Sequence, residues 1–343
     1  MKSLTAGSVL IATGSTINIP TLPGLAETGF WTSDTILDAA EIPDSFVVLG
    51  GGAIALEMAH FLEGIGRKVT VLQRNTQLLT GMDADVAEVV RDAFVKRGMD
   101  VHCETILQRV ETTKNGKRVH FTQNGQAHFA DAAEIFVALG RRPAVDSLDL
   151  ENVKVARNGG GRIDVKPTMQ TTHPHIFAAG DVCGPLEVVH LAIQQGEIAA
   201  KNATALFKGD AASHTMDYRC ALFGVFTHPQ VAAVGLSEVD AKMRDVSYFV
   251  ATYPFSDHGK SMVMGETEGF VKLLCDAKTG VLIGGSVVGP EATELIHEIA
   301  VAMHLGATAA QLAAAPHYHP TLSEVWTYPA EELAKKLSAT CCA

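Results

Sequence analysis

The sequence predicts an α/β protein built around a βαβ unit of the kind that binds dinucleotides. A continuous apolar run from Phe46 to Leu49 passes directly into three glycines, Gly50 to Gly52. Apolar residues then recur at helical spacing up to Gly66, and a second apolar run follows from Val69 to Leu72. A strand, a glycine turn, a helix and a second strand in this order are typical of such a unit.

The rest of the chain continues the α/β pattern. Short apolar runs bounded by Gly, Pro or Asn indicate strands, whereas longer segments with helical spacing indicate helices. Two Asn-Gly pairs, at Asn115 and Asn124, predict hairpin turns. In chain order we expect a buried strand at 8–12, helices at 33–40 and 84–97, a strand at 101–103, the two hairpins, buried strands at 135–139 and 176–179, a helix at 193–207, strands at 271–275 and 281–288, a helix at 292–304 and a tail helix beginning near Pro320.

Composition excludes several classes of function. A chain of 343 residues that is 47% hydrophobic and 19% charged can bury large cores and form two or three domains. Its formal net charge of -11, without a dense Lys/Arg cluster, would repel a phosphate backbone. The longest apolar stretches are too short to span a bilayer, and Met1 leads into a strand-like segment. We therefore expect a cytoplasmic protein that binds neither nucleic acid nor membranes.

The six cysteines are too few for a disulfide scaffold. Cys103, Cys183, Cys220 and Cys275 are scattered among apolar neighbours, so we expect most of them to be small buried side chains. The adjacent pair Cys341-Cys342 is the exception, because two neighbouring thiolates could bind a soft metal ion. Two incidental cysteines at the end of the chain are the alternative.

The glycine turn has the composition that a pyrophosphate site requires. Gly50 permits the tight turn, Gly52 lets the backbone approach the phosphates, and the small Ala55 allows the helix to pack closely on the strand. Anionic phosphates would lie at the helix N-terminus, where unpaired N–H groups favour negative charge. An ordinary glycine-rich turn in an α/β core is the alternative.

The end of the next strand bears on which nicotinamide nucleotide is bound. An acid that holds the ribose 2′-hydroxyl of NADH is expected about 20 residues after the glycines. The strand ends instead in Gln73-Arg74. A neutral residue followed by a guanidinium suits a 2′-phosphate, so NADP is favoured over NAD. A surface arginine that happens to follow a strand is the alternative.

Four segments follow one another along the chain: Gly50 to Glu57, Val137 to Pro143, Ile176 to Asp181 and His319 to Glu324. In this order they resemble the pyridine nucleotide-disulfide oxidoreductases, the family of dihydrolipoamide dehydrogenase, glutathione reductase and mercuric reductase. The sequence resembles this family over essentially its whole length. The resemblance implies a Rossmann-like NAD(P)-binding domain (41–144) inserted in a partial FAD-binding domain (1–40 and 145–212), followed by an α+β dimerisation domain (213–343).

The resemblance also implies cofactors and site residues. Asp181 would bind the flavin ribityl chain, and the strand that ends at Gly14 would border the FAD domain. The residues implied for FAD are Thr13, Gly14, Gly180 and Asp181; those implied for NADP or NAD are Gly50, Gly51, Gly52, Ala55, Glu57, Gln73, Arg74 and Gly140. The protein would act as a homodimer, because the family's catalytic histidine serves the partner subunit's disulfide.

Two parts of the family plan are not found in the sequence. The family places a first glycine-rich βαβ unit, for the ADP half of FAD, and a Cys-x4-Cys redox disulfide before the point at which this sequence begins. No second G-x-G-x-x-G follows a strand, and no two cysteines have that spacing. We therefore expect a truncated chain with impaired flavin binding and no dithiol-disulfide turnover of its own.

The segment His317 to Glu324 carries the expected proton chemistry. His319 precedes Pro320, which suits the first position of a helix, and the carboxylate of Glu324 could orient the imidazole and stabilise its charged form. In the family the corresponding histidine deprotonates the dithiol substrate, so His319 and Glu324 are the expected catalytic pair. His317 is expected to be structural. Without the resemblance, a surface His-Glu pair is the alternative.

The leading hypothesis is an FAD- and NAD(P)-dependent oxidoreductase of dihydrolipoamide dehydrogenase type, acting on a small dithiol or disulfide. Mercuric reductase is the second hypothesis, because those enzymes end in a vicinal pair like Cys341-Cys342 that receives Hg(II). The His319-Glu324 motif argues against mercury, whereas Gln73-Arg74 argues against the NAD-dependent dehydrogenase. A third hypothesis is a non-catalytic remnant that binds nucleotide and dimerises.

Overall fold

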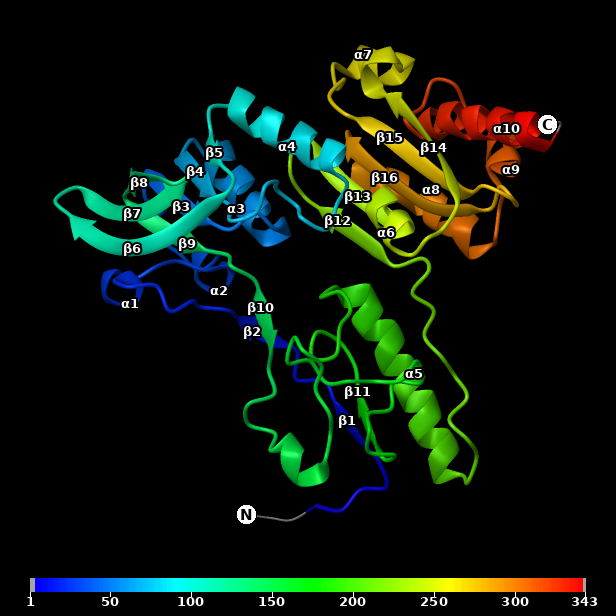
Figure 1. Ribbon diagram of the computed structural model, residues 1–343, viewed down its shortest axis with the longest axis horizontal. Coiled ribbons are helices and arrows are strands. Elements are labelled where there is room, and N and C mark those ends of the chain that lie inside the picture. Colours follow the sequence, from blue (N-terminus) through cyan, green and yellow to red (C-terminus); the bar gives the residue numbers. More distant parts are fainter. Residues whose placement is uncertain (1–3, 342–343) are drawn as a thin grey trace. The chain divides into compact units, whose positions relative to one another are not determined.

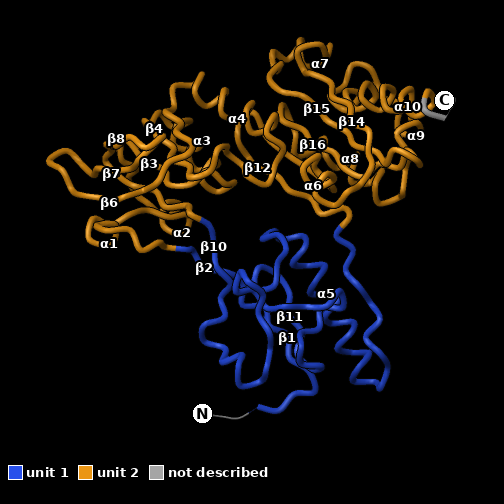
Figure 2. Tube along the Cα trace, viewed as in Figure 1, with its two compact units in different colours: residues 1–18, 140–218 blue, residues 19–139, 219–343 orange. Residues whose placement is uncertain are grey.

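The computed structural model describes residues 4–341 and contains two compact units (Figures 1 and 2). Unit 1 comprises the residues up to Asn18 and Gly140–Tyr218; unit 2 comprises Ile19–Leu139 and Arg219–Ala343. Each unit is thus assembled from two stretches of chain. No helix in the described part of the chain combines the length and apolarity needed to cross a bilayer.

The first half of unit 2 contains the βαβ unit that the glycine motif predicts. A parallel sheet has the strand order β5-β4-β3-β9, formed by Asp100–His102, Lys68–Leu72, Ser45–Leu49 and Glu134–Val137. Helix α3 (Ala53–Gly64) connects β3 to β4, and α4 (Ala84–Lys96) connects β4 to β5. Phe46 and Val48 are fully buried with Leu56 of α3 and Phe94 of α4 in one core. The predicted elements are confirmed here to within a few residues.

A three-stranded antiparallel sheet follows β5. Its strands β6 (Thr105–Thr113), β7 (Gly116–Gln123) and β8 (Gln126–Ala132) turn at the two Asn-Gly pairs, as predicted. Before β3, the helix predicted at 33–40 is only the single turn α2 (Ser33–Ile36), and a further short helix, α1 (Leu25–Thr28), packs Leu25 into the core that contains Val110 of β6. Residues 19–40 therefore pack within unit 2.

The second half of unit 2 is an antiparallel sheet with helices. The strand order is β12-β13-β16-β15-β14, and α8 (Ala292–His304) packs on β13 and β16. A core that includes Phe255, Ile299 and Trp326 lies between the sheet and its helices. The strands are Leu222–Val225, Gln230–Gly235, Leu282–Gly289, Phe270–Asp276 and Tyr248–Pro254; the other helices are α6 (Glu238–Met243), α7 (Gly259–Met264), α9 (Ala309–Ala314) and α10 (Thr327–Cys341).

Unit 1 is built from short strands and one long helix. Strand β1 (Val9–Ile11) pairs in parallel with β11 (Ile176–Ala178), and β2 (Ser15–Ile17) pairs antiparallel with β10 (Arg141–Pro143). Helix α5 (Val189–Phe207) begins four residues before the predicted 193. The prediction of a buried first strand is wrong for Val9 and Leu10, which are about half exposed; in the described chain β1 has a strand neighbour, β11, on one edge.

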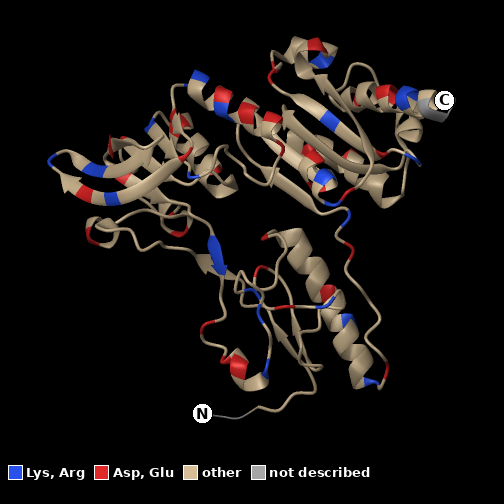
Figure 3. Cartoon of the chain, in the orientation of Figure 1, with Lys and Arg blue, Asp and Glu red and all other residues tan. Residues whose placement is uncertain are grey.

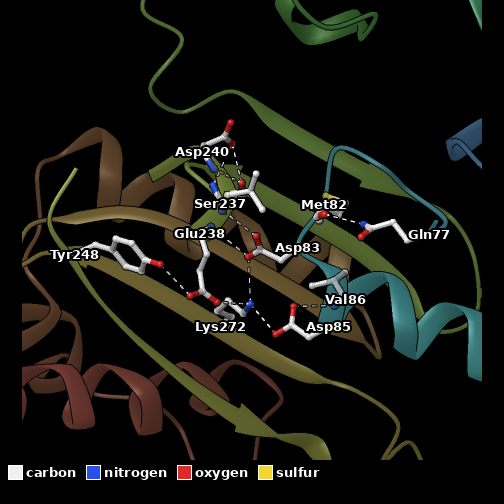
Figure 4. A network of polar contacts seen from close by, with 11 residues as sticks. Gln77, Met82, Asp83, Asp85, Val86, Ser237, Glu238, Asp240, Tyr248 and Lys272 are labelled. Carbon is white, nitrogen blue, oxygen red and sulfur yellow. Dashed lines mark hydrogen bonds and ion pairs between the residues drawn. The ribbon is translucent and has the colours of Figure 1, made fainter. Parts of the chain in front are cut away.

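A buried lysine joins the two halves of unit 2 (Figure 4). Nζ of Lys272, on β15, lies 3.1 Å from Oδ2 of Asp83 at the start of α4, 2.7 Å from Oδ2 of Asp85 and 2.9 Å from Oε1 of Glu238 on α6. Burial alone would lower the pKa of Lys272, but the surrounding carboxylates raise it above its usual value. The ion pairs of Lys272 join the half of unit 2 that contains the parallel sheet to the half that contains the antiparallel sheet.

Charged side chains of both signs are interspersed along the chain, for example on α4 (Figure 3). Several form exposed ion pairs, including that of Arg118 with Asp131 at 2.6 Å. Of the four cysteines before the C-terminal pair, Cys183 and Cys275 are buried, whereas Cys103 and Cys220 are partly exposed. Burial raises the pKa of Cys183 to about 11, so this thiol is protonated at neutral pH.

Candidate cofactor and catalytic sites

The glycine turn between β3 and α3 has one side that is packed and one that is open. Gly50 has φ 122°, and a Cβ there would lie 2.3 Å from the carbonyl oxygen of Ala138. The same Cβ would lie 3.6 Å from Cβ of Ala55, so the small third residue is needed for close packing. A Cβ on Gly52, which immediately precedes α3, would meet nothing within 4 Å. The open backbone at Gly52 lies where the N–H groups of α3 can receive an anion.

The side chain of Gln73 makes its hydrogen bonds within the loop that follows β4. Its side chain is buried, Nε2 donates to the carbonyl of Gln77 at 3.0 Å, and Oε1 accepts from the N–H of Arg74 at 2.9 Å. A Cβ on Gly51 would lie 2.8 Å from the Gln73 carboxamide carbon. The Gln73 side chain therefore packs against Gly51 of the glycine turn. The neighbouring Arg74 is exposed.

Glu57 faces another part of unit 2. Its Oε1 accepts a hydrogen bond of 3.0 Å from the N–H of Phe226, just after β12. Burial raises the pKa of Glu57, and this hydrogen bond opposes the rise only in part. The side chain thus ties α3 to the antiparallel half.

In unit 1 three distant segments converge on the hydroxyl of Ser15. Ser15 Oγ donates to Oδ2 of Asp181 at 2.7 Å, and Nε of Arg141 donates to Ser15 Oγ at 2.7 Å. Beside them, Thr13 Oγ1 donates to the carbonyl of Ala144 at 2.7 Å. The segment Thr13-Gly14, Asp181 and the residue after Gly140 therefore lie together. Sequence reasoning named Asp181 but missed Ser15 and Arg141, although Arg141 lies within the Gly140-Arg141 motif.

The loop after β11 is fixed by a buried glutamine that sequence reasoning also missed. The N–H of Gly180 donates to Oε1 of Gln195 at 2.7 Å, while Gln195 Nε2 donates to the carbonyl of Gly184 at 2.6 Å and to Tyr218 Oη at 2.9 Å. Gln195 is only 1% exposed. Helix α5 therefore holds the Gly180-Asp181 turn in place through one side chain.

The predicted pair at the C-terminal end of unit 2 is in contact. Nδ1 of His319 lies 2.9 Å from Oε2 and 3.1 Å from Oε1 of Glu324. The imidazole is 76% exposed, whereas the Glu324 side chain is only 10% exposed. An ionised carboxylate can only accept, so Nδ1 carries the hydrogen, and Nε2 of the neutral ring is left as an acceptor.

The local backbone differs from the prediction that Pro320 begins a helix. A 3₁₀ turn covers Ser323–Trp326, and α10 begins only at Thr327. The indole N–H of Trp326 donates to the carbonyl of Leu295 at 3.1 Å and buries this turn against α8. The His319-Pro320 peptide is cis and lies in the preceding loop. The buried position of Glu324 therefore comes from the anchored 3₁₀ turn.

His317, expected to be structural, faces a different carboxylate. Its Nε2 lies 2.6 Å from Oε1 of Glu298 on α8, and its Nδ1 lies 2.9 Å from the carbonyl oxygen of Ala315. Burial lowers the pKa of His317, but these two hydrogen bonds outweigh burial and raise it above its usual value. The metal site predicted at Cys341 and Cys342 lies outside the side chains that the structure describes.

Comparison with known proteins agrees with this architecture. Residues 1–196 match the family model for pyridine nucleotide-disulphide oxidoreductases, and residues 223–330 match the dimerisation domain of that family. The dihydrolipoyl dehydrogenase of Geobacillus stearothermophilus is 32% identical over 96% of this chain and 69% of its own length. That of Chlorobaculum tepidum is 36% identical over 94% of this chain and 68% of its own.

Solved structures from the same group of enzymes have a similar fold. The structure of LpdA from Mycobacterium tuberculosis superposes with a TM-score of 0.83 at 30% identity, over 95% of this chain and 69% of that one. The HOCl-induced flavoprotein disulfide reductase RclA from Escherichia coli has a TM-score of 0.82 at 27% identity, over 94% of this chain and 73% of that one. The predicted fold class is confirmed, and the chain belongs to the pyridine nucleotide-disulphide oxidoreductase family.

Proposed function

We propose that the protein acts in the FAD-dependent transfer of electrons between a small dithiol and NAD(P), as the dihydrolipoyl dehydrogenases do. The observation that carries the proposal is the contact of an exposed imidazole, His319, with the buried carboxylate of Glu324 at 2.9 Å. This pair has the tautomer and the exposure that a general base for a small thiol requires. The many dihydrolipoyl dehydrogenases among the relatives support a dithiol as the substrate.

The residues of this chain supply the proton chemistry. The neutral His319 ring accepts the thiol proton at Nε2, and Glu324, which receives the Nδ1–H hydrogen bond, stabilises the resulting imidazolium. A positioned base of this kind contributes roughly 10²- to 10⁴-fold to a rate. When it is bound, FAD supplies the redox centre that exchanges a hydride with the nicotinamide.

The residues present also fit the two cofactors. We assign the nicotinamide nucleotide to the turn at Gly50, Gly51 and Gly52 because Gly52 and the start of α3 offer open backbone for a pyrophosphate. We assign the flavin to the Thr13-Gly14 and Gly180-Asp181 segments, where the Asp181 carboxylate is held by Ser15 and keeps further acceptor capacity for ribityl hydroxyls. The proposed domains are those of the family: nucleotide-binding 41–144, flavin-binding 1–40 with 145–212, and dimerisation 213–343; of the flavin-binding part, residues 19–40 pack within unit 2.

We further propose that the nucleotide is NADP. Arg74 carries an exposed guanidinium at the end of β4, and Gln73 beside it is neutral and occupied in the loop. The variant Arg74→Gln should weaken NADPH binding about tenfold or more and leave NADH binding within about twofold, because only NADPH has the 2′-phosphate. Fluorescence titration of both nucleotides measures this. Equal losses for the two nucleotides would instead assign Arg74 a structural role.

The whole activity is tested with purified, flavin-loaded protein that also contains the family's first glycine-rich unit and its Cys-x4-Cys disulfide. We expect oxidation of dihydrolipoamide with NADP⁺ or NAD⁺, a dimer by light scattering, and strong loss of turnover in His319→Gln. Reduction of Hg(II) without dithiol oxidation, abolished by Cys341→Ala with Cys342→Ala, would favour mercuric reductase. Binding of NADPH without flavin or diaphorase activity would favour a non-catalytic nucleotide-binding dimer.

A further inference from the structure

Glu324 has a second imidazole beside it, the buried ring of His258. His258 immediately precedes α7 and is fully buried. Its Nε2 lies 3.6 Å from Oε1 of Glu324, and no atom within 3.5 Å accepts or donates a hydrogen bond at this nitrogen in the described structure. The buried carboxylate therefore lies between two histidines, one exposed and one buried.

The other ring nitrogen of His258 determines its tautomer. Nδ1 lies 2.8 Å from Oγ of Ser261, which is also fully buried. An ionised carboxylate cannot donate, so the nitrogen that faces Glu324 must carry the hydrogen. Nδ1 then accepts, and the Ser261 hydroxyl donates to it. The result is a directed chain in which Ser261 donates to His258 and His258 donates toward Glu324.

Aromatic rings hold the imidazole of His258 in this orientation. Tyr328 of α10 meets it edge-on at 6.2 Å between ring centroids, and Phe255 does so at 6.3 Å. Tyr328 in turn stacks on Tyr253 at 4.0 Å. Burial lowers the pKa of His258, although the nearby charge of Glu324 opposes the shift, while His319 adds to it. His258 thus acts as a neutral donor and not as a second cation.

We propose that His258 is a positioning residue for the pair of His319 and Glu324: its Nε2, 3.6 Å from Oε1 of Glu324, carries the hydrogen and attracts the carboxylate electrostatically, which keeps the carboxylate against Nδ1 of His319. The inference rests on the proposed role of His319. A buried carboxylate that loses a neighbouring N–H dipole takes up a proton more readily or turns away. Either change removes negative charge from the neighbourhood of His319.

A pair of amide variants separates positioning from packing. In His258→Gln the amide nitrogen replaces Nε2, so the N–H that faces Glu324 is kept. In His258→Asn the amide nitrogen replaces Nδ1, so only the contact with Ser261 is kept. The pKa of His319 is measured in the full chain by NMR of ¹³C-labelled histidine, with His319→Gln to assign the resonance. We expect this pKa to fall by about half a unit or more in His258→Asn and to stay within about 0.2 unit of the parent in His258→Gln.

Equal pKa values of His319 in the two variants, or a rise in His258→Asn, would overturn the proposal. If His258→Asn does not fold, the ¹⁵N shifts of the unaltered protein decide: hydrogen on Nε2 of His258 supports the proposal, and hydrogen on Nδ1 overturns it. These measurements require no turnover. If the protein shows the expected shifts but no dithiol is oxidised even when the flavin and the family's Cys-x4-Cys disulfide are present, the proposed function is refuted and the positioning role of His258 stands.

Discussion

Nδ1 of His319 and Oε2 of Glu324 are 2.9 Å apart, although the imidazole is three-quarters exposed and the carboxylate is buried. The burial of Glu324 removes competing water from the carboxylate, and the exposure of His319 leaves the other ring nitrogen accessible to a substrate. The two residues are five positions apart, and the anchored 3₁₀ turn between Ser323 and Trp326 fixes their separation.

Replacing His319 should separate dithiol chemistry from nicotinamide chemistry. In the flavin-loaded protein, His319→Gln should lower the rate of dithiol oxidation about 10²- to 10³-fold, because the amide cannot accept the thiol proton. Transfer from NADPH to an artificial electron acceptor should stay within about twofold, since it requires no base for a thiol. The control is His317→Gln, whose ring pairs with Glu298. Full dithiol activity in His319→Gln would refute the assigned role.

Alanine substitutions at two glycines of the nucleotide turn should change different properties, stability at Gly50 and nucleotide binding at Gly52. Gly50→Ala should lower the free energy of unfolding by about 1–3 kcal/mol, because its Cβ would lie 2.3 Å from the carbonyl oxygen of Ala138 at a φ of 122°. Gly52→Ala should fold normally, since its Cβ meets nothing within 4 Å, yet bind NADPH at least about tenfold more weakly. Thermal unfolding and nucleotide titration of both variants check this. Normal NADPH binding by Gly52→Ala would place the pyrophosphate elsewhere.

Removing Lys272 should destabilise unit 2 strongly. Lys272→Met leaves the buried Asp83 and the partly buried Glu238 without their cation, so we expect a loss of about 3–5 kcal/mol in urea unfolding at neutral pH. Asp85→Asn, at a carboxylate that is 46% exposed, should cost at most about 1 kcal/mol. A similar small loss in both variants would mean that the network contributes little.

The raised pKa of Lys272 determines how its contribution to the stability of the fold changes with pH. The stabilisation is complete below the unfolded value of 10.5 and is lost only as the pH rises through the higher folded value. The difference between the parent and Lys272→Met should therefore be constant from neutral pH to about pH 10. A difference that disappears below that range would contradict a raised pKa.

His317 should give the protein a pH dependence near neutrality. Because its folded pKa is raised above 6.5, the pair with Glu298 stabilises the fold fully below pH 6.5, and this stabilisation is lost as the pH rises through the folded value. Glu298→Gln removes the main partner of the charged ring. The fall in melting temperature between about pH 5.5 and about pH 8.5 should therefore be smaller in Glu298→Gln than in the parent. An equal fall in both proteins would show that another group titrates.

The elements that the sequence predicts best are those whose pattern is local. The apolar run before Gly50 and the spacing in 292–304 locate β3 and α8 to within a residue, because each buries one continuous face or strand. Strands β12 and β14 were missed, since their residues are mostly only partly buried and alternate weakly. The prediction that a helix begins at Pro320 was wrong, because the packing of Trp326 in the core of the antiparallel half decides where α10 begins. Residues far apart in the sequence form that core.

The residues that complete the sites could not be predicted from the sequence for a different reason. Ser15 contacts Asp181 across 166 positions, and Lys272 contacts Asp83 across 189. Only tertiary structure brings such pairs together, and a lone serine, lysine or histidine in the sequence has no feature that indicates its partner. His258 is another example, because it lies far from Glu324 in sequence and within an ordinary polar loop.

The division of unit 1 between two stretches of chain has a consequence for biosynthesis. Val9 of β1 pairs with Ile176 of β11, so the first strand leaves the ribosome long before its neighbour exists. The parallel sheet of β3, β4, β5 and β9 and the β6–β8 sheet are complete by then and can form earlier. During that interval the edge of β1 that later binds β11, which includes the apolar Val9 and Leu10, has no β11 to pair with. Protection of this edge by a chaperone would therefore matter most while residues 19–175 are being translated.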